Sequence, residues 1–157
     1  MGRSVGRPIA AVAFAVAALA GAVALLRPAD AEGVRLRPDD PATTARGAAI
    51  YAAECAACHG AALEGQPDWR TPGPDGLRPA PPHNATGHTW HHDDATLFAL
   101  TKHGLAGLMA DAPPSAMPAF DGVLTDAEIV AVLSYIKSTW PAPVRARHDA
   151  VNEGAGR

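Results

Sequence analysis

The sequence predicts an all-α fold in which a few helices are joined by long loops. Apolar side chains recur at helical spacing in three stretches, and no stretch alternates polar and apolar residues as a strand would. The 157 residues include 15 Gly and 15 Pro, which favours irregular connections over a regular sheet. Only eight residues are aromatic, while 36 are Ala. A domain this poor in large side chains buries little apolar area, and a large prosthetic group would supply the missing contacts.

The first 31 residues are typical of an export or membrane-insertion signal. Arg3 and Arg7 precede residues 9–26, which are 18 uncharged and mostly apolar residues. This run is longer than most signal-peptide cores and nearly as long as a membrane span, so we expect an anchor. The alternative is cleavage near Ala31, after a small-residue recognition sequence. Either way the body is delivered across the membrane, which in a bacterium means the periplasmic side.

The segment after the leader, residues 32–42, has mixed charges and no apolar period, and we interpret it as a tether. Thr43 or Thr44 can cap a first helix that ends near Cys58. Residues 60–92 then hold five Gly and six Pro. We expect them to form a long loop of the kind that wraps a ligand or covers a site.

Two more helices follow this loop. Asp93 or Asp94 starts the second helix, and Gly104 ends it. The third helix opens with a capping box and carries an apolar stripe before Trp140 and Pro141 close it. Its box is Thr125 with Glu128, and its stripe is Ile129, Val132, Leu133 and Ile136. The expected organisation is a leader over 1–31, a tether over 32–42, a domain over 43–140 and a flexible tail over 141–157.

The segment Cys55-Ala-Ala-Cys58-His59 carries the chemistry. Two thiols one helical turn apart, beside an imidazole, can bond to both vinyl groups of a haem and ligate its iron from one side. A thioredoxin-like site would need a preceding strand. A structural zinc site would have to recruit one more histidine, and a disulfide across this spacing is strained. The export signal favours haem, because c-type haem is attached outside the cytoplasm.

Over residues 45–140 the chain resembles the class I monohaem cytochromes c. The matching residues are Gly47, Tyr51, Cys55, Cys58, His59, Gly60, Met117, Pro118, Ala119, Phe120, Leu133, Ser134, Tyr135 and Ile136. The resemblance implies a small cytochrome c fold, with three to four helices and long loops wrapped round one covalently bound haem c. It also implies that His59 ligates the iron and that the first and last helices cross through Gly47, Tyr51 and Tyr135.

The resemblance assigns the distal iron ligand to Met117, in the second long loop. Pro118 stiffens the chain directly after it and so fixes the aim of the thioether. The alternatives are Met109, which does not match the family motif, and a histidine. In the family a proline carbonyl accepts a hydrogen bond from the proximal histidine, and Pro81 or Pro82 can fill that role.

Four histidines lie within ten residues around Trp90, and they admit two interpretations. They are His83, His88, His91 and His92. In the favoured one, Trp90 and one or two of the histidines form hydrogen bonds with the haem propionates. In the other, the histidines bind a second metal ion, copper or zinc.

These features predict an electron carrier and not an enzyme. His59 and Met117 would fill both axial positions of the iron, so no small-molecule substrate is expected. The net charge of −3 disfavours a nucleic-acid-binding protein. We expect single electrons to pass between redox proteins on the periplasmic side of the inner membrane. The alternatives are a cytochrome subunit of a larger membrane oxidoreductase complex, and a peroxidase-like haem enzyme with a labile distal ligand.

Overall fold

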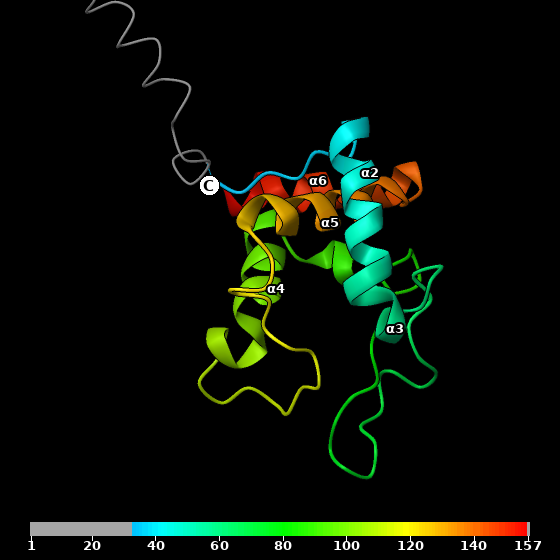
Figure 1. The fold of residues 1–157 in the computed structure, drawn as a ribbon, viewed down its shortest axis with the longest axis vertical. Helices are drawn as coiled ribbons and strands as arrows, with labels where there is room; N and C mark the ends of the chain where they lie inside the picture. The colour runs from blue at the N-terminus through cyan, green and yellow to red at the C-terminus, as the bar shows by residue number, and fades with distance from the viewer. Residues whose placement is uncertain (1–32, 157) are drawn as a thin grey trace, which may run out of the picture. The chain divides into compact units, whose positions relative to one another are not determined.

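A computed structural model describes residues 33–156 of the chain. Residues 34–156 belong to one compact unit. The described residues contain helices but no β-strand, so the all-α prediction is confirmed. Figure 1 shows how the helices are arranged. The elements are α2 (Pro41–Ile50), η2 (Tyr51–Cys55), α3 (Ala56–His59), η3 (Thr89–His91), α4 (Asp94–Leu108), α5 (Asp126–Ser138) and α6 (Ala142–Ala155).

The first helical stretch begins earlier than the sequence suggested. Asp40, and neither Thr43 nor Thr44, is the N-cap of α2, and its side chain accepts a hydrogen bond from the backbone N–H of Ala42. Pro41 occupies the first turn, where its fixed φ suits a helix and its missing N–H costs nothing. The Thr43 hydroxyl donates to the Asp40 carboxylate at 2.6 Å, so it supports the cap from inside the helix.

Helices α2 and α5 cross closely, and Gly47 permits the contact (Figure 1). A Cβ at residue 47 would lie 2.0 Å from the carbonyl oxygen of Ala131 on α5. The rings of Tyr51 and Tyr135 meet beside this crossing, with centroids 5.6 Å apart. The expected crossing through these residues is therefore present. The core around it contains Leu36, Tyr51, Leu63, Leu97, Ile129, Val132, Leu133, Ile136 and Trp140.

The caps of α4 and α5 follow the sequence pattern, and so does the break at Gly104. Asp93 caps α4 through the backbone N–H of Thr96, and Thr125 with Glu128 forms the expected capping box of α5. Gly104, with φ 70°, ends the first helical run of α4 as predicted, and a second short run follows this kink as far as Leu108. A positive φ is accessible to glycine without strain, so the chain can bend there and resume helical turns.

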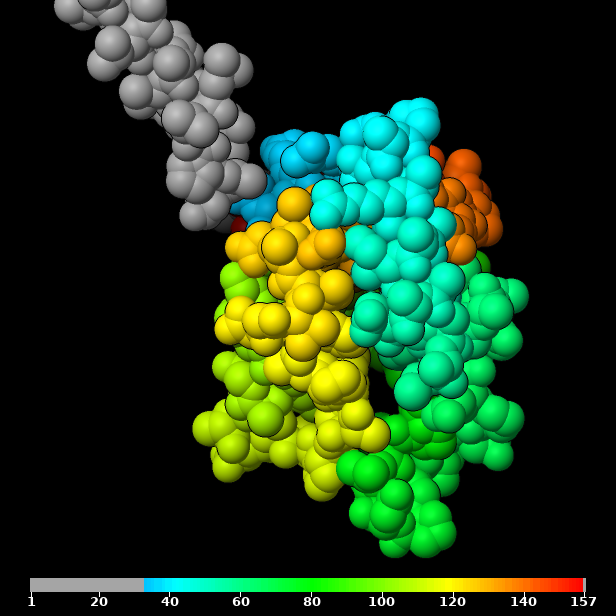
Figure 2. Space-filling view, in the orientation of Figure 1, coloured from blue at the N-terminus to red at the C-terminus, as the bar shows by residue number. Residues whose placement is uncertain are grey.

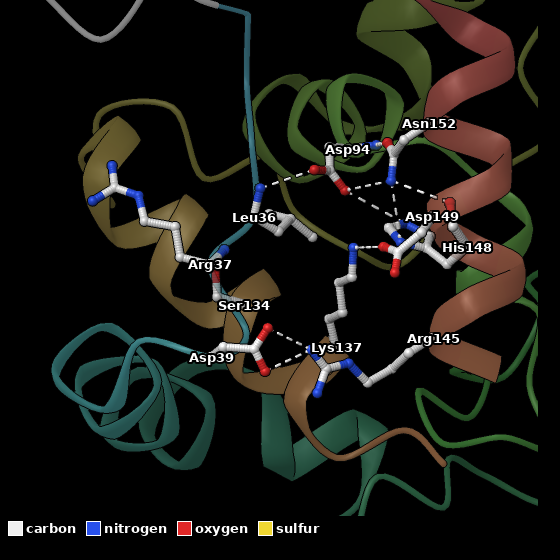
Figure 3. Close-up of polar contacts among 10 residues, drawn as sticks. All are labelled: Leu36, Arg37, Asp39, Asp94, Ser134, Lys137, Arg145, His148, Asp149 and Asn152. Carbon is white, nitrogen blue, oxygen red and sulfur yellow. Dashed lines mark hydrogen bonds and ion pairs between the residues drawn. The ribbon is translucent and has the colours of Figure 1, made fainter. Parts of the chain in front are cut away.

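The segment expected to be a tether is docked along the domain. Leu36 is buried, and its backbone N–H donates to the Asp94 carboxylate at 2.8 Å (Figure 3). The next backbone N–H, of Arg37, donates to the Ser134 hydroxyl at 2.8 Å. The side chains that accept these bonds lie on α4 and α5, far away in the sequence, which is why local composition did not reveal the contacts.

The prediction of a flexible tail over 141–157 is wrong, because residues Ala142–Ala155 form α6. Polar contacts fix this helix to the rest of the domain (Figure 3). Lys137 Nζ lies 2.6 Å from the Asp149 carboxylate, and Arg145 pairs with Asp39 at 2.7 Å. His148 is the buried residue of α6. A helix held mainly by polar contacts has no apolar period, so its sequence resembles a tail.

Within residues 33–156, no helix is long and apolar enough to cross a membrane. The predicted anchor over residues 9–26 and the alternative cleavage point near Ala31 lie outside the described residues.

Candidate functional site

The C-x-x-C-H motif occupies the end of the first helical stretch, where α-helical hydrogen bonding gives way to one π-helical turn. The backbone N–H of Ala56 donates to the carbonyl of Tyr51, five residues earlier, and such turns are frequent at functional sites. Cys55 is half-buried, Cys58 is exposed, and both thiols are free. Burial, followed by the charges of Glu54 and Cys58, raises the pKa of Cys55 to about 11. The protein therefore presents two free thiols one helical turn apart.

The imidazole of His59 is buried and held in one orientation. Its Nδ1 lies 2.8 Å from the carbonyl oxygen of Pro81. A carbonyl oxygen only accepts hydrogen bonds, so Nδ1 carries the proton and Nε2 keeps a lone pair. Burial lowers the pKa of His59, while the bond to Pro81 raises it in part. A neutral imidazole oriented through Nδ1 is the usual form of a metal-ligating histidine.

The contact involves Pro81 and not its neighbour because the loop is tightly folded around Pro82. A Cβ at Gly87 would lie 1.9 Å from the carbonyl oxygen of Pro82, and one at Gly65 would lie 2.5 Å from its nitrogen. The backbone N–H of Gly65 also donates to the His59 carbonyl at 2.8 Å. These close approaches bring the Pro81 carbonyl against the His59 ring.

His83 stacks on His59, a contact that the sequence did not reveal. The two ring centroids lie 4.0 Å apart with an interplanar angle of 23°. His83 Nδ1 lies 2.8 Å from the hydroxyl of Thr89, and its carbonyl accepts a hydrogen bond from Trp140 Nε1 at 2.7 Å. Burial, followed by the neighbouring histidines, lowers the pKa of His83 to about 3. His83 therefore packs as a neutral ring that supports His59.

The other three histidines of the cluster each meet a different aromatic ring. His88 stacks on Trp69 at 5.2 Å, His91 stacks on Trp90 at 3.8 Å, and His92 meets His88 edge-on at 5.5 Å. In the part of the chain that the structure describes, no group of three or more His, Cys, Asp or Glu side chains is arranged to hold a metal ion. The geometry thus gives no support to a second metal site here.

Met117 lies in the irregular segment between α4 and α5. The end of this segment is fixed, because Phe120 is buried and its backbone N–H donates to the Thr101 carbonyl at 3.1 Å. Met117 itself is 40% exposed and Met109 is 52% exposed. Figure 2 shows a hollow between this segment, coloured yellow, and the green segments across from it. Large apolar side chains are exposed along this part of the chain, at Leu108, Met109, Met117 and Val123.

A buried imidazole with a free Nε2, beside two thiols, defines a site of the kind that holds a covalently bound haem. Residues 44–140 match the cytochrome c family. This is more than half of the chain, and the protein therefore belongs to the cytochrome c family, in its class I of c-type cytochromes. We found no match among curated proteins or among solved structures. Membership of this family implies that the protein binds one haem c covalently. Its members generally carry electrons, and the protein serves haem-based electron transfer. The family also indicates an exported protein.

The residues present fit this group. Trp90 Nε1 is buried and has no hydrogen-bond partner among the described residues. Buried indole N–H groups normally find an acceptor, and a haem offers two carboxylates. Cys55 and Cys58 would hold the haem covalently, and His59 Nε2 is the nitrogen available to its iron.

Proposed function

We propose that this cytochrome passes single electrons between redox proteins on the periplasmic side of the inner membrane, with His59 and Met117 as the axial ligands of its haem iron. The haem supplies one-electron chemistry when it is bound. The chain attaches it through Cys55 and Cys58 and orients the proximal ligand.

The observation that carries the proposal is the 2.8 Å contact between His59 Nδ1 and the Pro81 carbonyl. It fixes the ring plane and directs the Nε2 lone pair away from the loop. It also raises the basicity of the ligating nitrogen, which strengthens a bond to iron. His83, stacked on the same ring, prevents the imidazole from rotating.

Two features support Met117 as the distal ligand. Its thioether is exposed on the segment between α4 and α5, which Phe120 and the Thr101 carbonyl pin at its end. Pro118 directly follows and restricts the backbone. Methionine opposite histidine raises the reduction potential of a haem, and two protein ligands leave the iron no position for a substrate.

On this proposal Trp90 Nε1 donates to a haem carboxylate, because its N–H is buried without another acceptor. The arginines of the leader support the assignment to the periplasmic side of the membrane, and its apolar run supports the anchor. The partners are redox proteins that dock weakly and exchange electrons at the haem edge. A permanent place in a membrane oxidoreductase complex is the alternative for the same chemistry.

The test is the visible and far-red absorption spectrum of the matured protein, oxidised and reduced. We expect a low-spin haem with the weak far-red band of a sulfur–iron bond. Met117→Ala should abolish this band, whereas the control Met109→Ala should retain it. A high-spin wild-type spectrum, or ready binding of carbon monoxide, would refute His/Met ligation and favour an enzyme with an open distal side.

A further inference from the structure

Helix α6 lies beyond residues 44–140, which match the family, and it packs against η3, the short helix that carries Trp90. The guanidinium carbon of Arg147 lies 5.3 Å from the centroid of a Trp90 ring. This is within the range of a cation–π contact. A segment outside the matched residues therefore reaches Trp90, the residue that follows Thr89 on η3.

The backbone of Arg147 is held in place because helix α6 is attached to the rest of the domain. Residues on either side of it are tied to other parts of the domain (Figure 3). Arg145 pairs with Asp39 at 2.7 Å, and Asn152 Oδ1 accepts a hydrogen bond from the backbone N–H of Asp94 at 2.8 Å. Because α6 is held at both ends, Arg147 is presented to Trp90 from a fixed support.

Two contacts connect η3 to the proximal iron ligand. The Thr89 hydroxyl bonds His83 Nδ1 at 2.8 Å, and the His83 ring stacks on His59 at 4.0 Å. Trp90 is the next residue, and its buried Nε1 has no acceptor among the described residues. Placement of η3 thus decides where this indole N–H points.

We propose that Arg147 is a positioning residue for the haem: it holds the Trp90 ring so that Nε1 donates to a haem carboxylate, and so raises the reduction potential. The proposal rests on the proposed function. A guanidinium prefers the face of an indole, and it therefore resists tilting of the ring. A well-placed N–H withdraws negative charge from the carboxylate, which disfavours the ferric state because that state carries one more positive charge.

The experiment measures the midpoint potential of the haem-loaded full chain in four variants. Arg147→Gln and Trp90→Phe should both lower the potential, and Arg147→Lys, which keeps the charge, should restore part of the loss. Arg46→Gln is the matched control, since it removes the same charge at an exposed residue of α2 that pairs with Glu128 and takes no part in holding α6. Its potential should equal that of the wild type. Arg147 is exposed, so its replacement should leave the fold intact, and thermal unfolding checks this.

A double variant separates positioning from a direct charge effect. If Arg147 acts through Trp90, then Arg147→Gln should have no further effect on the potential in the Trp90→Phe background. Additive shifts would overturn the proposal, and so would an Arg147→Gln potential equal to that of Arg46→Gln. Failure of the proposed function has a different signature. A missing sulfur–iron band refutes Met117 ligation alone, while absence of covalent haem refutes both.

Discussion

Gly47→Ala should destabilise the domain even though alanine is the better helix former. The new Cβ would lie 2.0 Å from the Ala131 carbonyl oxygen and 2.8 Å from Tyr135 Cβ. Ordinary contacts begin at 3.4 Å, so α2 and α5 would have to separate by about 1.4 Å. Overpacking of a core costs about 1–3 kcal/mol. We expect the upper end, because a backbone carbonyl has no rotamer that avoids the clash.

The helix propensity of alanine offsets about 1 kcal/mol of this cost, which leaves a net loss of about 2 kcal/mol. For a domain of this size the loss lowers the unfolding midpoint by about 8 °C. Thermal unfolding followed by circular dichroism measures it. Gly154→Ala on α6 is the control, because a Cβ there meets nothing within 4 Å, and it should leave stability unchanged or slightly higher. Equal midpoints for the two variants would refute the close crossing.

Two other substitutions test the polar framework. Burial, followed by the charge of Lys137, lowers the pKa of His148 below its usual 6.5. Below pH 6.5 the unfolded chain therefore binds a proton at this residue that the folded chain does not. The free energy of unfolding should fall as the pH is lowered. His148→Gln should reduce this slope in urea titrations at several pH values, and an unchanged slope would contradict a buried neutral imidazole. Thr125→Ala should cost about 1 kcal/mol by removing the cap of α5, whereas Thr125→Ser should retain most of the stability, as measured by urea unfolding. Equal losses in both would mean that the hydroxyl does not cap the helix.

The parts of the fold that depend on local signals were predictable from the sequence. The Thr125 capping box and the apolar stripe of α5 stand as the spacing indicated. The resemblance to cytochromes c supplied what local signals lack, namely that Gly47 and Tyr51 meet Tyr135 across the chain. The choice between Pro81 and Pro82 needed the structure, because it depends on how two glycines fold the loop.

The parts held by distant polar partners were not predictable. Helix α6 buries a histidine and uses ion pairs to Asp39 and Lys137, so its sequence shows no apolar face. The segment before α2 is docked by backbone donors whose acceptors, Asp94 and Ser134, lie 58 and 97 residues away. The sequence indicates metal or propionate binding for His83. Its stacking on His59 could not be predicted, because it depends on how the long loop folds back onto the first helix.

The single π-helical turn at Tyr51–Cys55 decides in which direction the haem-binding residues face, relative to the side of the helix that crosses α5. Each residue of an α-helix turns the chain by about 100°. If Tyr51–Cys55 were wound as ordinary α-helix with no residue removed, the thiols and imidazole would swing by about that angle while Gly47 stayed against α5. The helix would survive and its two faces would fall out of phase. One extra residue thus lets the crossing and the cofactor face be aligned independently within the same stretch of helix.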